Sequence, residues 1–142
     1  MRMKRIALFF VLLIPAFILA QSPEKLINKG EYDRAIVVCV EKLQNGKGKK
    51  HELYSGLKRA YETANYNDRN KITELKASGK PEIWFDVFMT YDAMQKRFMT
   101  VRSIESQLAE DQVNIELKDH SKDLEVSRQN AAAYLYAHAV SL

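Results

Sequence analysis

The chain has 142 residues, a formal net charge of +4, 28% charged residues, and only five Gly and three Pro. That length allows one modest domain, and the composition favours a soluble helical protein over a disordered chain. The single cysteine excludes a disulfide framework within the chain.

The first twenty residues have the three-part layout of a secretory signal peptide. Arg2, Lys4 and Arg5 precede an uncharged run over 6–19, and Ala20 is a small residue suited to cleavage. We therefore expect cleavage after Ala20 and an exported protein, in the periplasm, the cell envelope or the medium. The alternative is an uncleaved leader that anchors the protein, although a membrane span usually needs ~20 apolar residues.

Removing the leader also removes most of the charge imbalance. Three of the 22 basic residues lie in the leader, which leaves 19 basic and 18 acidic residues in 21–142. A net charge of +1 gives little support for nucleic-acid binding. We expect no nucleic-acid partner.

The mature chain begins with two predicted helices. Ser22 as cap and Pro23 at the first helical position predict a short helix. Gly30 tolerates the left-handed conformation that ends it. The following segment predicts an amphipathic helix, with Glu31 and Asp33 in its first turn. Its apolar face recurs at three- and four-residue steps and consists of Tyr32, Ala35, Ile36, Cys39 and Leu43. We expect Cys39 to be buried and inert.

This segment, 30–43, resembles the turn and second helix of a tetratricopeptide (TPR) repeat. Leu57 and Tyr61 keep the four-residue step of a TPR first helix, and Tyr54 stands where that family often has Trp. A turn is then predicted at 65–67, 35 residues after Gly30, with a second helix over 68–78. The matching positions of the first unit are Gly30, Glu31, Tyr32, Ala35, Ile36, Cys39 and Leu43. The resemblance covers 22–78 and implies stacked antiparallel helix pairs with a protein partner.

Gly79 and Pro81 mark the clearest break between helices, because Gly ends one helix and Pro begins the next. The 81–101 segment predicts a helix with the richest apolar stripe of the chain. Core packing is the favoured interpretation, and an exposed groove for a partner peptide is the alternative. We expect Phe88 and Met94 in the core, with Trp84 and Tyr91 partly buried against the preceding helices.

The segment 103–108 continues or restarts that helix. Apolar and polar residues alternate over 113–118, which predicts an extended linker, since a lone strand would have no sheet to join. The last helix is predicted to begin at 119–121. Either it caps the helical stack or the chain is the front of a longer repeat array. One apolar face of this helix consists of Ala132, Leu135, Ala139 and Leu142.

No pattern in the chain predicts catalytic or metal chemistry. His51, His120 and His138 are far apart in sequence, and none has a second ligand at metal-binding spacing. Motifs of serine, cysteine and metallo-hydrolases are not present in the sequence. We expect no catalytic residue, no cofactor and no metal.

These observations favour an exported, all-α, TPR-like adaptor spanning 21–142 that binds a peptide or helix of a partner protein. Because Trp and Tyr dominate binding hot spots, the expected aromatic anchors are Tyr54, Tyr61, Trp84 and Tyr91. The runner-up is a membrane-anchored structural helical protein of the cell envelope. An enzyme is the third alternative.

Overall fold

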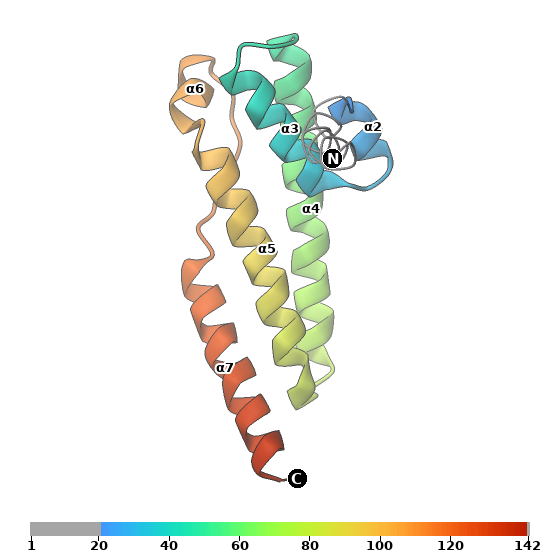
Figure 1. The fold of residues 1–142 in the computed structure, drawn as a ribbon, viewed down its shortest axis with the longest axis vertical. Helices are drawn as coiled ribbons and strands as arrows, with labels where there is room; N and C mark the ends of the chain where they lie inside the picture. The colour runs from blue at the N-terminus through green and yellow to red at the C-terminus, as the bar shows by residue number, and fades with distance from the viewer. Residues whose placement is uncertain (1–20, 142) are drawn as a thin grey trace, which may run out of the picture. The chain divides into compact units, whose positions relative to one another are not determined.

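The computed structural model of the protein describes residues 21–141, which contain six α-helices, one short 3-10 helix and no β-strand (Figure 1). The predicted all-α fold class is therefore confirmed. The predicted signal peptide at 1–20 and Leu142 lie outside the described residues. The chain divides between Ala60 and Tyr61 into two compact units, each described by itself below.

The first unit holds α2 (Pro23–Asn28), α3 (Tyr32–Gln44) and the first turns of α4 (Lys50–Ala77). The Ser22 side chain accepts a hydrogen bond from the main-chain N–H of Lys25 at 3.3 Å, as expected of a helix cap. Gly30 has a φ of +76°, so the predicted left-handed turn is confirmed. Helix α3 can therefore turn back and pack on α2.

The core of this unit contains the predicted apolar face of α3. Ala35, Ile36, Cys39 and Leu43 are all buried, whereas Tyr32 is only half-buried. The start of α4 contributes Leu57, which is also fully buried. Cys39 is 0% exposed, and the predicted burial of its thiol is confirmed.

Helix α4 is longer than the sequence analysis predicts. It continues without a break through 65–67, so the predicted turn there and the separate helix over 68–78 are wrong. No Gly or Pro interrupts the chain between Gly56 and Gly79, and Asn in a helix costs at most about 0.7 kcal/mol relative to Ala. Asn65 is also buried and bonded to Arg97 within the second unit, which favours the helical conformation.

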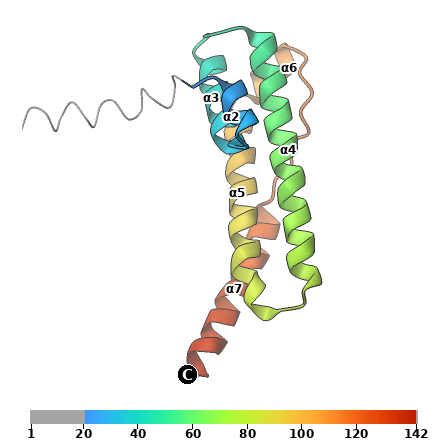
Figure 2. The ribbon, with the colours of Figure 1, turned by 90° about the vertical axis from the view of Figure 1, so that its right-hand side faces the viewer.

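The second unit contains α4 from Tyr61 onward, η1 (Pro81–Ile83), α5 (Trp84–Arg102), α6 (Glu105–Glu110) and α7 (Ser121–Val140). Helices α4 and α5 form an antiparallel hairpin, visible in Figure 2, which turns at Gly79 with a φ of +65°. Pro81 begins η1, so the predicted break between helices is confirmed. Helix α7 runs antiparallel to α5 and packs along it (Figures 1 and 2).

The connection between α5 and α7 agrees with the sequence prediction. A short break at Ser103 and Ile104 separates α5 from α6, so the helix restarts rather than continues. Residues 113–120 form neither helix nor strand, which confirms the predicted linker. Ile115 of this linker is buried.

A cluster of four buried side chains forms the core between α4 and α5: Ile72, Ile83, Val87 and Met94. The prediction for Met94 is confirmed, because this side chain is 0% exposed. The prediction for Phe88 is wrong, because Phe88 is only half-buried and its neighbour Val87 is the core residue. Successive residues of a helix point about 100° apart, so Phe88 lies at the edge of the face on which Val87 is buried. Trp84 and Tyr91 are partly buried against the cluster, as predicted.

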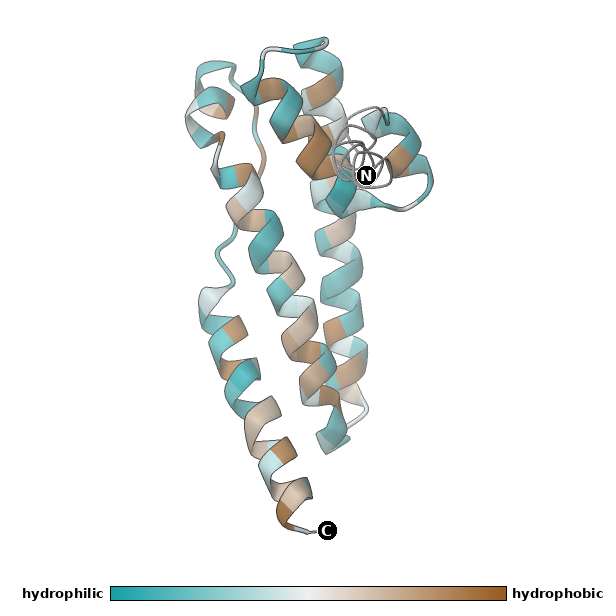
Figure 3. Cartoon of the chain, viewed as in Figure 1, coloured by the Kyte–Doolittle hydropathy of each residue, from teal (hydrophilic) through white to brown (hydrophobic). Residues whose placement is uncertain are grey.

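The predicted apolar face of the last helix is exposed where it is described. Leu135 is 53% exposed, and Ala132 and Ala139 are exposed as well. Helix α7 instead buries Ser127 and Ala131. The small size of both side chains allows a close approach of the backbone. The last turns of α7 therefore carry a mainly apolar exposed surface, which Figure 3 shows in its hydropathy colours.

Within residues 21–141, no helix has the length and apolar character that crossing a membrane requires.

Candidate functional site

A buried polar network fixes α4 against α5 in the second unit. The Arg97 guanidinium donates from Nη1 to Asn65 Oδ1 at 2.6 Å and from Nη2 to Asp68 Oδ2 at 2.8 Å. The Arg97 side chain is 4% exposed, so its charge is almost fully removed from solvent. Asn65 and Asp68 are one helical turn apart, and a single guanidinium can bond both only while α4 is helical there. This network sets the rotation of α4 beside α5.

Three adjoining cavities follow one side of α4, with volumes of about 320, 260 and 460 Å³. The first and second share Arg69, Lys118 and His120, and the second and third share Lys76. We name them together the α4 groove. Seven residues of α4 line it: Tyr61, Glu62, Asn65, Arg69, Ile72, Thr73 and Lys76.

The opposite wall of the α4 groove comes from three other segments of the second unit. The 113–120 linker contributes Lys118 and His120, and α5 contributes Tyr91 and Trp84. Helix α7 contributes Asp123. From residue 61 to residue 76 the α4 wall rises about 22 Å along the helix axis. An extended peptide of about six or seven residues has that length.

Three of the four predicted aromatic anchors lie in the α4 groove. Tyr61 lines the first cavity, Tyr91 the second and Trp84 the third. Lys76 lies between the last two, with its Nζ 5.6 Å from the centroid of the Tyr91 ring and 6.0 Å from that of Trp84. Tyr54 is not among them, because it belongs to the first unit and lines none of the three cavities.

Tyr61 places a buried hydroxyl in the α4 groove. The residue is 2% exposed, and its hydroxyl has no hydrogen-bond partner among residues 21–141. Burial raises the pKa of Tyr61. The Asn65 side chain and the main chain of Lys118 lie close enough to oppose that rise in pKa, but neither has the geometry of a hydrogen bond to the hydroxyl. Tyr61 is therefore a neutral donor whose hydrogen bond is unused.

His120 places a second buried polar group in the same cavity. It is 3% exposed, and no described residue forms a hydrogen bond with its Nδ1. Asp123 Oδ2 lies 3.9 Å from this nitrogen. Burial lowers the pKa of His120, and the nearby Lys118 lowers it further. The imidazole is therefore neutral at pH 7, and its contact with Asp123 is not an ion pair. The main-chain N–H of His120 donates to Gln95 Oε1 at 2.7 Å, which anchors the linker to α5.

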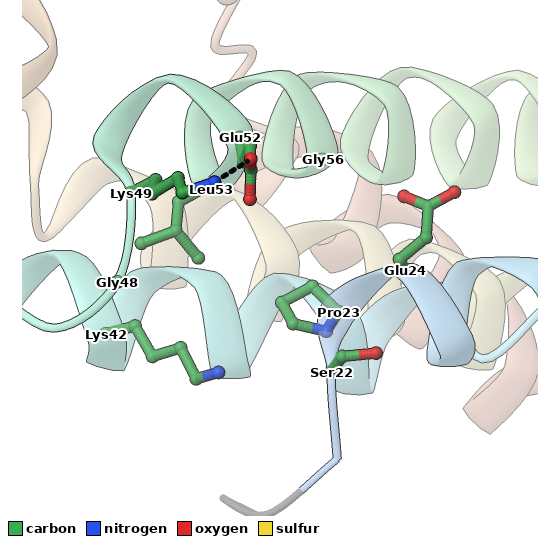
Figure 4. Close-up of a pocket in the computed structure, with 9 residues that line it drawn as sticks. All are labelled: Ser22, Pro23, Glu24, Lys42, Gly48, Lys49, Glu52, Leu53 and Gly56. Carbon is green, nitrogen blue, oxygen red and sulfur yellow. Dashed lines mark hydrogen bonds and ion pairs between the residues drawn. The ribbon is translucent and has the colours of Figure 1, made fainter.

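A separate cleft of about 380 Å³ lies in the first unit, where the starts of α2 and α4 approach the end of α3 (Figure 4). Lys49 Nζ forms an ion pair with Glu52 Oε1 at 3.0 Å there, and both side chains are largely exposed. Glu24 is paired with Arg59. The only buried side-chain polar atoms without a partner in the described part of the chain belong to Tyr61 and His120. The α4 groove is therefore the better candidate site.

Cys39 lies outside both sites. Burial raises the pKa of its thiol to about 12, which makes the thiolate scarce at neutral pH. Across residues 21–141, no three His, Cys, Asp or Glu side chains gather as metal ligands would.

Comparison of the chain with protein-family models, with curated proteins and with solved structures found no match in any of the three.

Arg69 and Lys118, two charged residues of the α4 groove, were not predicted from the sequence as site residues. Tyr61, Asn65, Arg69 and Thr73 recur every four residues, a spacing that places them along one side of a helix. This spacing indicates a shared side only if α4 is one continuous helix. The predicted turn at 65–67 therefore prevented the pattern from being recognised. Lys118 and His120 carry no comparable signal, because the linker's position beside α4 depends on tertiary packing.

Proposed function

We propose that the protein is an exported, TPR-like interaction module of the cell envelope, and that it binds a peptide or helix of a partner protein in the α4 groove without catalysis. One observation carries the proposal: Tyr61, Tyr91 and Trp84 come from two helices and line a single groove. Tyr and Trp side chains are typical of interface hot spots. The TPR resemblance of 30–43 gives independent support for a protein partner and for stacked helix pairs.

The lining of the α4 groove suits a peptide better than a small metabolite. Its floor includes the core residues Ile72 and Met94, and its rim carries charges of both signs, such as Arg69 and Asp123. An apolar floor with a few polar groups at the edge binds side chains while fixing their register. Three adjoining cavities along about 22 Å of helix could each receive one side chain of an extended segment.

The protonation states in the α4 groove support binding rather than catalysis. A nucleophile is normally activated by a lowered pKa or by an adjacent base, and a catalytic histidine is normally oriented by a hydrogen bond from its ring to a carboxylate. The pKa of Tyr61 is raised, so its phenolate is disfavoured. The pKa of His120 is lowered, and its nearest carboxylate is too distant to orient the ring through a hydrogen bond. Both groups are suited to hydrogen bonding in their neutral forms.

The location proposed for the protein depends on the leader at 1–20. Its basic start, apolar run and Ala20 support export with cleavage. N-terminal sequencing of the protein from its source cell should begin at Gln21. Sequence that begins at Met1 would favour the membrane-anchored structural protein instead.

Photo-crosslinking in the source cell tests the binding function. A photoreactive phenylalanine at position 91 or 84 should capture one partner at both positions. The matched control is position 66, because Tyr66 is an aromatic residue of α4 that is 59% exposed and does not line the groove. Capture of the same protein at all three positions, or at none, would contradict the α4 groove as the binding site.

A further inference from the structure

Two cations in the middle of the α4 groove have no acidic partner in the described part of the chain. Arg69 from α4 and Lys118 from the linker each line both the first and the second cavity. Neither makes an ion pair within residues 21–141. Two like charges that line the same two cavities repel each other, and an anion bound between them would offset that repulsion.

The same place offers two buried groups whose hydrogen bonds are unused. The Tyr61 hydroxyl and His120 Nδ1 have no partner, although both residues are more than nine-tenths buried. Buried polar groups are nearly always hydrogen-bonded in native proteins, and an unpaired one is costly. A ligand atom that accepts a hydrogen bond from the Tyr61 hydroxyl would satisfy it. A neutral His120 can likewise donate from Nδ1 in one of its tautomers.

Three acidic residues that line the same cavities bear on which anion can bind there. Glu62 and Glu116 line the first cavity, and Asp123 lines the second. The first cavity therefore has two acids for its two cations, and this balance leaves no excess positive charge to hold a doubly charged group such as a phosphate. A carboxylate carries a single charge, and its two oxygens match the fork of an arginine.

We propose that Arg69, Lys118, Tyr61 and His120 form a carboxylate-binding subsite in the α4 groove, so that the preferred peptide carries an acidic residue or a free C-terminus at this point. The inference rests on the proposed function, and it adds the chemistry of the ligand. An acidic side chain and a C-terminal carboxylate share this chemistry, and the test separates them.

The test uses the full exported chain and three synthetic pentapeptides as probes. The first is acetyl-Ala-Leu-Asp-Leu-Ala-amide, the second has Asn in place of Asp, and the third is the Asn peptide with a free C-terminus. Binding is followed by titration with nuclear magnetic resonance, through the main-chain amides of Lys118 and His120. The Asp peptide should bind about tenfold more tightly than the Asn amide, as expected for one charge-assisted hydrogen bond. If the free C-terminus restores tight binding, the subsite takes a terminal carboxylate as well.

Substitution of the two cations completes the test. Arg69→Gln and Lys118→Gln should each weaken the Asp peptide about tenfold and leave the Asn peptide unchanged. Both side chains are exposed, so both variants should fold. Lys71→Gln is the matched control, because Lys71 is an exposed lysine of α4 that does not line the groove.

Two outcomes would overturn the subsite. The first is equal affinity for the Asp and Asn peptides, and the second is no shift of the Lys118 and His120 amides with any of the three peptides. The photo-crosslinking experiment decides the proposed function separately. Suppose that a partner is captured at positions 91 and 84, and that an Arg69→Gln Lys118→Gln double variant captures it equally well. The carboxylate subsite would then be rejected, whereas the α4 groove would remain the binding site.

Discussion

The guanidinium of Arg97 in α5 forms a buried ion pair with the carboxylate of Asp68 in α4, with 2.8 Å between Nη2 and Oδ2. The same guanidinium donates to Asn65, one helical turn earlier. A buried charge is tolerated when its partner and its hydrogen bonds are in place, and removal of one partner leaves it uncompensated. This pair therefore holds α4 and α5 in one register, and that register positions Tyr61 and Arg69 in the α4 groove.

Asp68→Asn should destabilise the protein. We expect a loss of about 2–3 kcal/mol in the free energy of unfolding, measured by urea denaturation, because the variant removes the countercharge of Arg97. The loss stays below the ~3–5 kcal/mol of a fully buried pair, since Asp68 is 22% exposed and Asn65 still accepts from Arg97.

Asp92→Asn is the matched control for that experiment. Asp92 forms an ion pair with Lys96 on the surface of α5, and the Lys96 side chain is 76% exposed. Exposed pairs of this kind contribute about 0–1 kcal/mol. Equal losses in the two variants would mean that the Arg97–Asp68 pair does not hold α4 against α5.

Local signals predicted most of the fold. Ser22, Gly30, Gly79 and Pro81 each act through the backbone of their own turn, and the structure places each of them as expected. The error at 65–67 has a different origin, because the repeat spacing favoured a turn where the local sequence is compatible with helix. Arg97 lies 32 residues from Asn65 in the sequence, and no local sequence pattern predicts the hydrogen bond between them.

The candidate site was predicted only in its aromatic part. Tyr61, Trp84 and Tyr91 were predictable because large aromatic residues on amphipathic helices either form the core or line its edge. Lys118 is exposed and charged, like most of the 22 basic residues of the chain, and only its position across from Arg69 distinguishes it. That position depends on how the 113–120 linker lies beside α4.

Substitution should lower the free energy of unfolding at Gly30 and raise it at Gly56. Gly30→Val should cost about 1–3 kcal/mol of unfolding free energy, because Val strongly disfavours the φ of +76° found there. Gly56→Ala should gain about 0.5–1 kcal/mol, because Gly56 is inside α4 and Ala is the better helix former. The added Cβ would lie 3.6 Å from Ile27 Cδ1 and 3.8 Å from Cys39 Sγ, which are ordinary contacts. Thermal melting of both variants checks the signs, and an unchanged midpoint for Gly30→Val would contradict the left-handed turn.

Cys39 should react slowly with thiol reagents in the native protein and rapidly in urea. Its side chain is 0% exposed and its thiol pKa is raised to about 12. Because the unfolded thiol ionises near its ordinary pKa of 9.0, this raised pKa also lowers stability as pH rises from about 9 toward 12. Absorbance with an aromatic disulfide reagent measures the reaction. Native labelling as fast as unfolded labelling would place Cys39 on the surface.

His120 should make the protein less stable in mild acid. Its pKa is lowered in the folded state, first by burial and then by Lys118 and Arg69, against the opposing effects of Asp123 and Asp119. As pH falls below about 6.5, the unfolded chain binds a proton at this histidine while the folded chain resists it, so unfolding becomes easier.

His120→Gln should reduce the change of unfolding free energy with pH in this range. Urea denaturation between pH 5 and pH 7.5 measures it, because that range brackets the ordinary pKa of histidine, about 6.5. The matched control is His51→Gln, since His51 is exposed and belongs to the first unit. If both variants keep the full slope, the buried imidazole is not its source.

Alanine substitutions along α5 should separate core residues from binding residues. Met94 is 0% exposed, so Met94→Ala should cost about 2–5 kcal/mol of unfolding free energy, as core truncations do. Phe88 is half-buried and does not line the α4 groove. Phe88→Ala should therefore cost less than Met94→Ala, although Phe is the larger residue, and it should leave partner capture unchanged.

Trp84→Ala and Tyr91→Ala should each reduce both the stability of the protein and the binding of its partner. Both side chains pack at the edge of the core cluster and also line the α4 groove. We expect a moderate loss of stability, about 1–2 kcal/mol, since only part of each side chain is buried. Each variant should remain folded but no longer bind its partner. Photo-crosslinking measures this loss, with the photoreactive residue at position 91 in Trp84→Ala and at position 84 in Tyr91→Ala. If these two variants are as unstable as Met94→Ala but keep their partner, both residues act only as core and the partner binds elsewhere on the molecule.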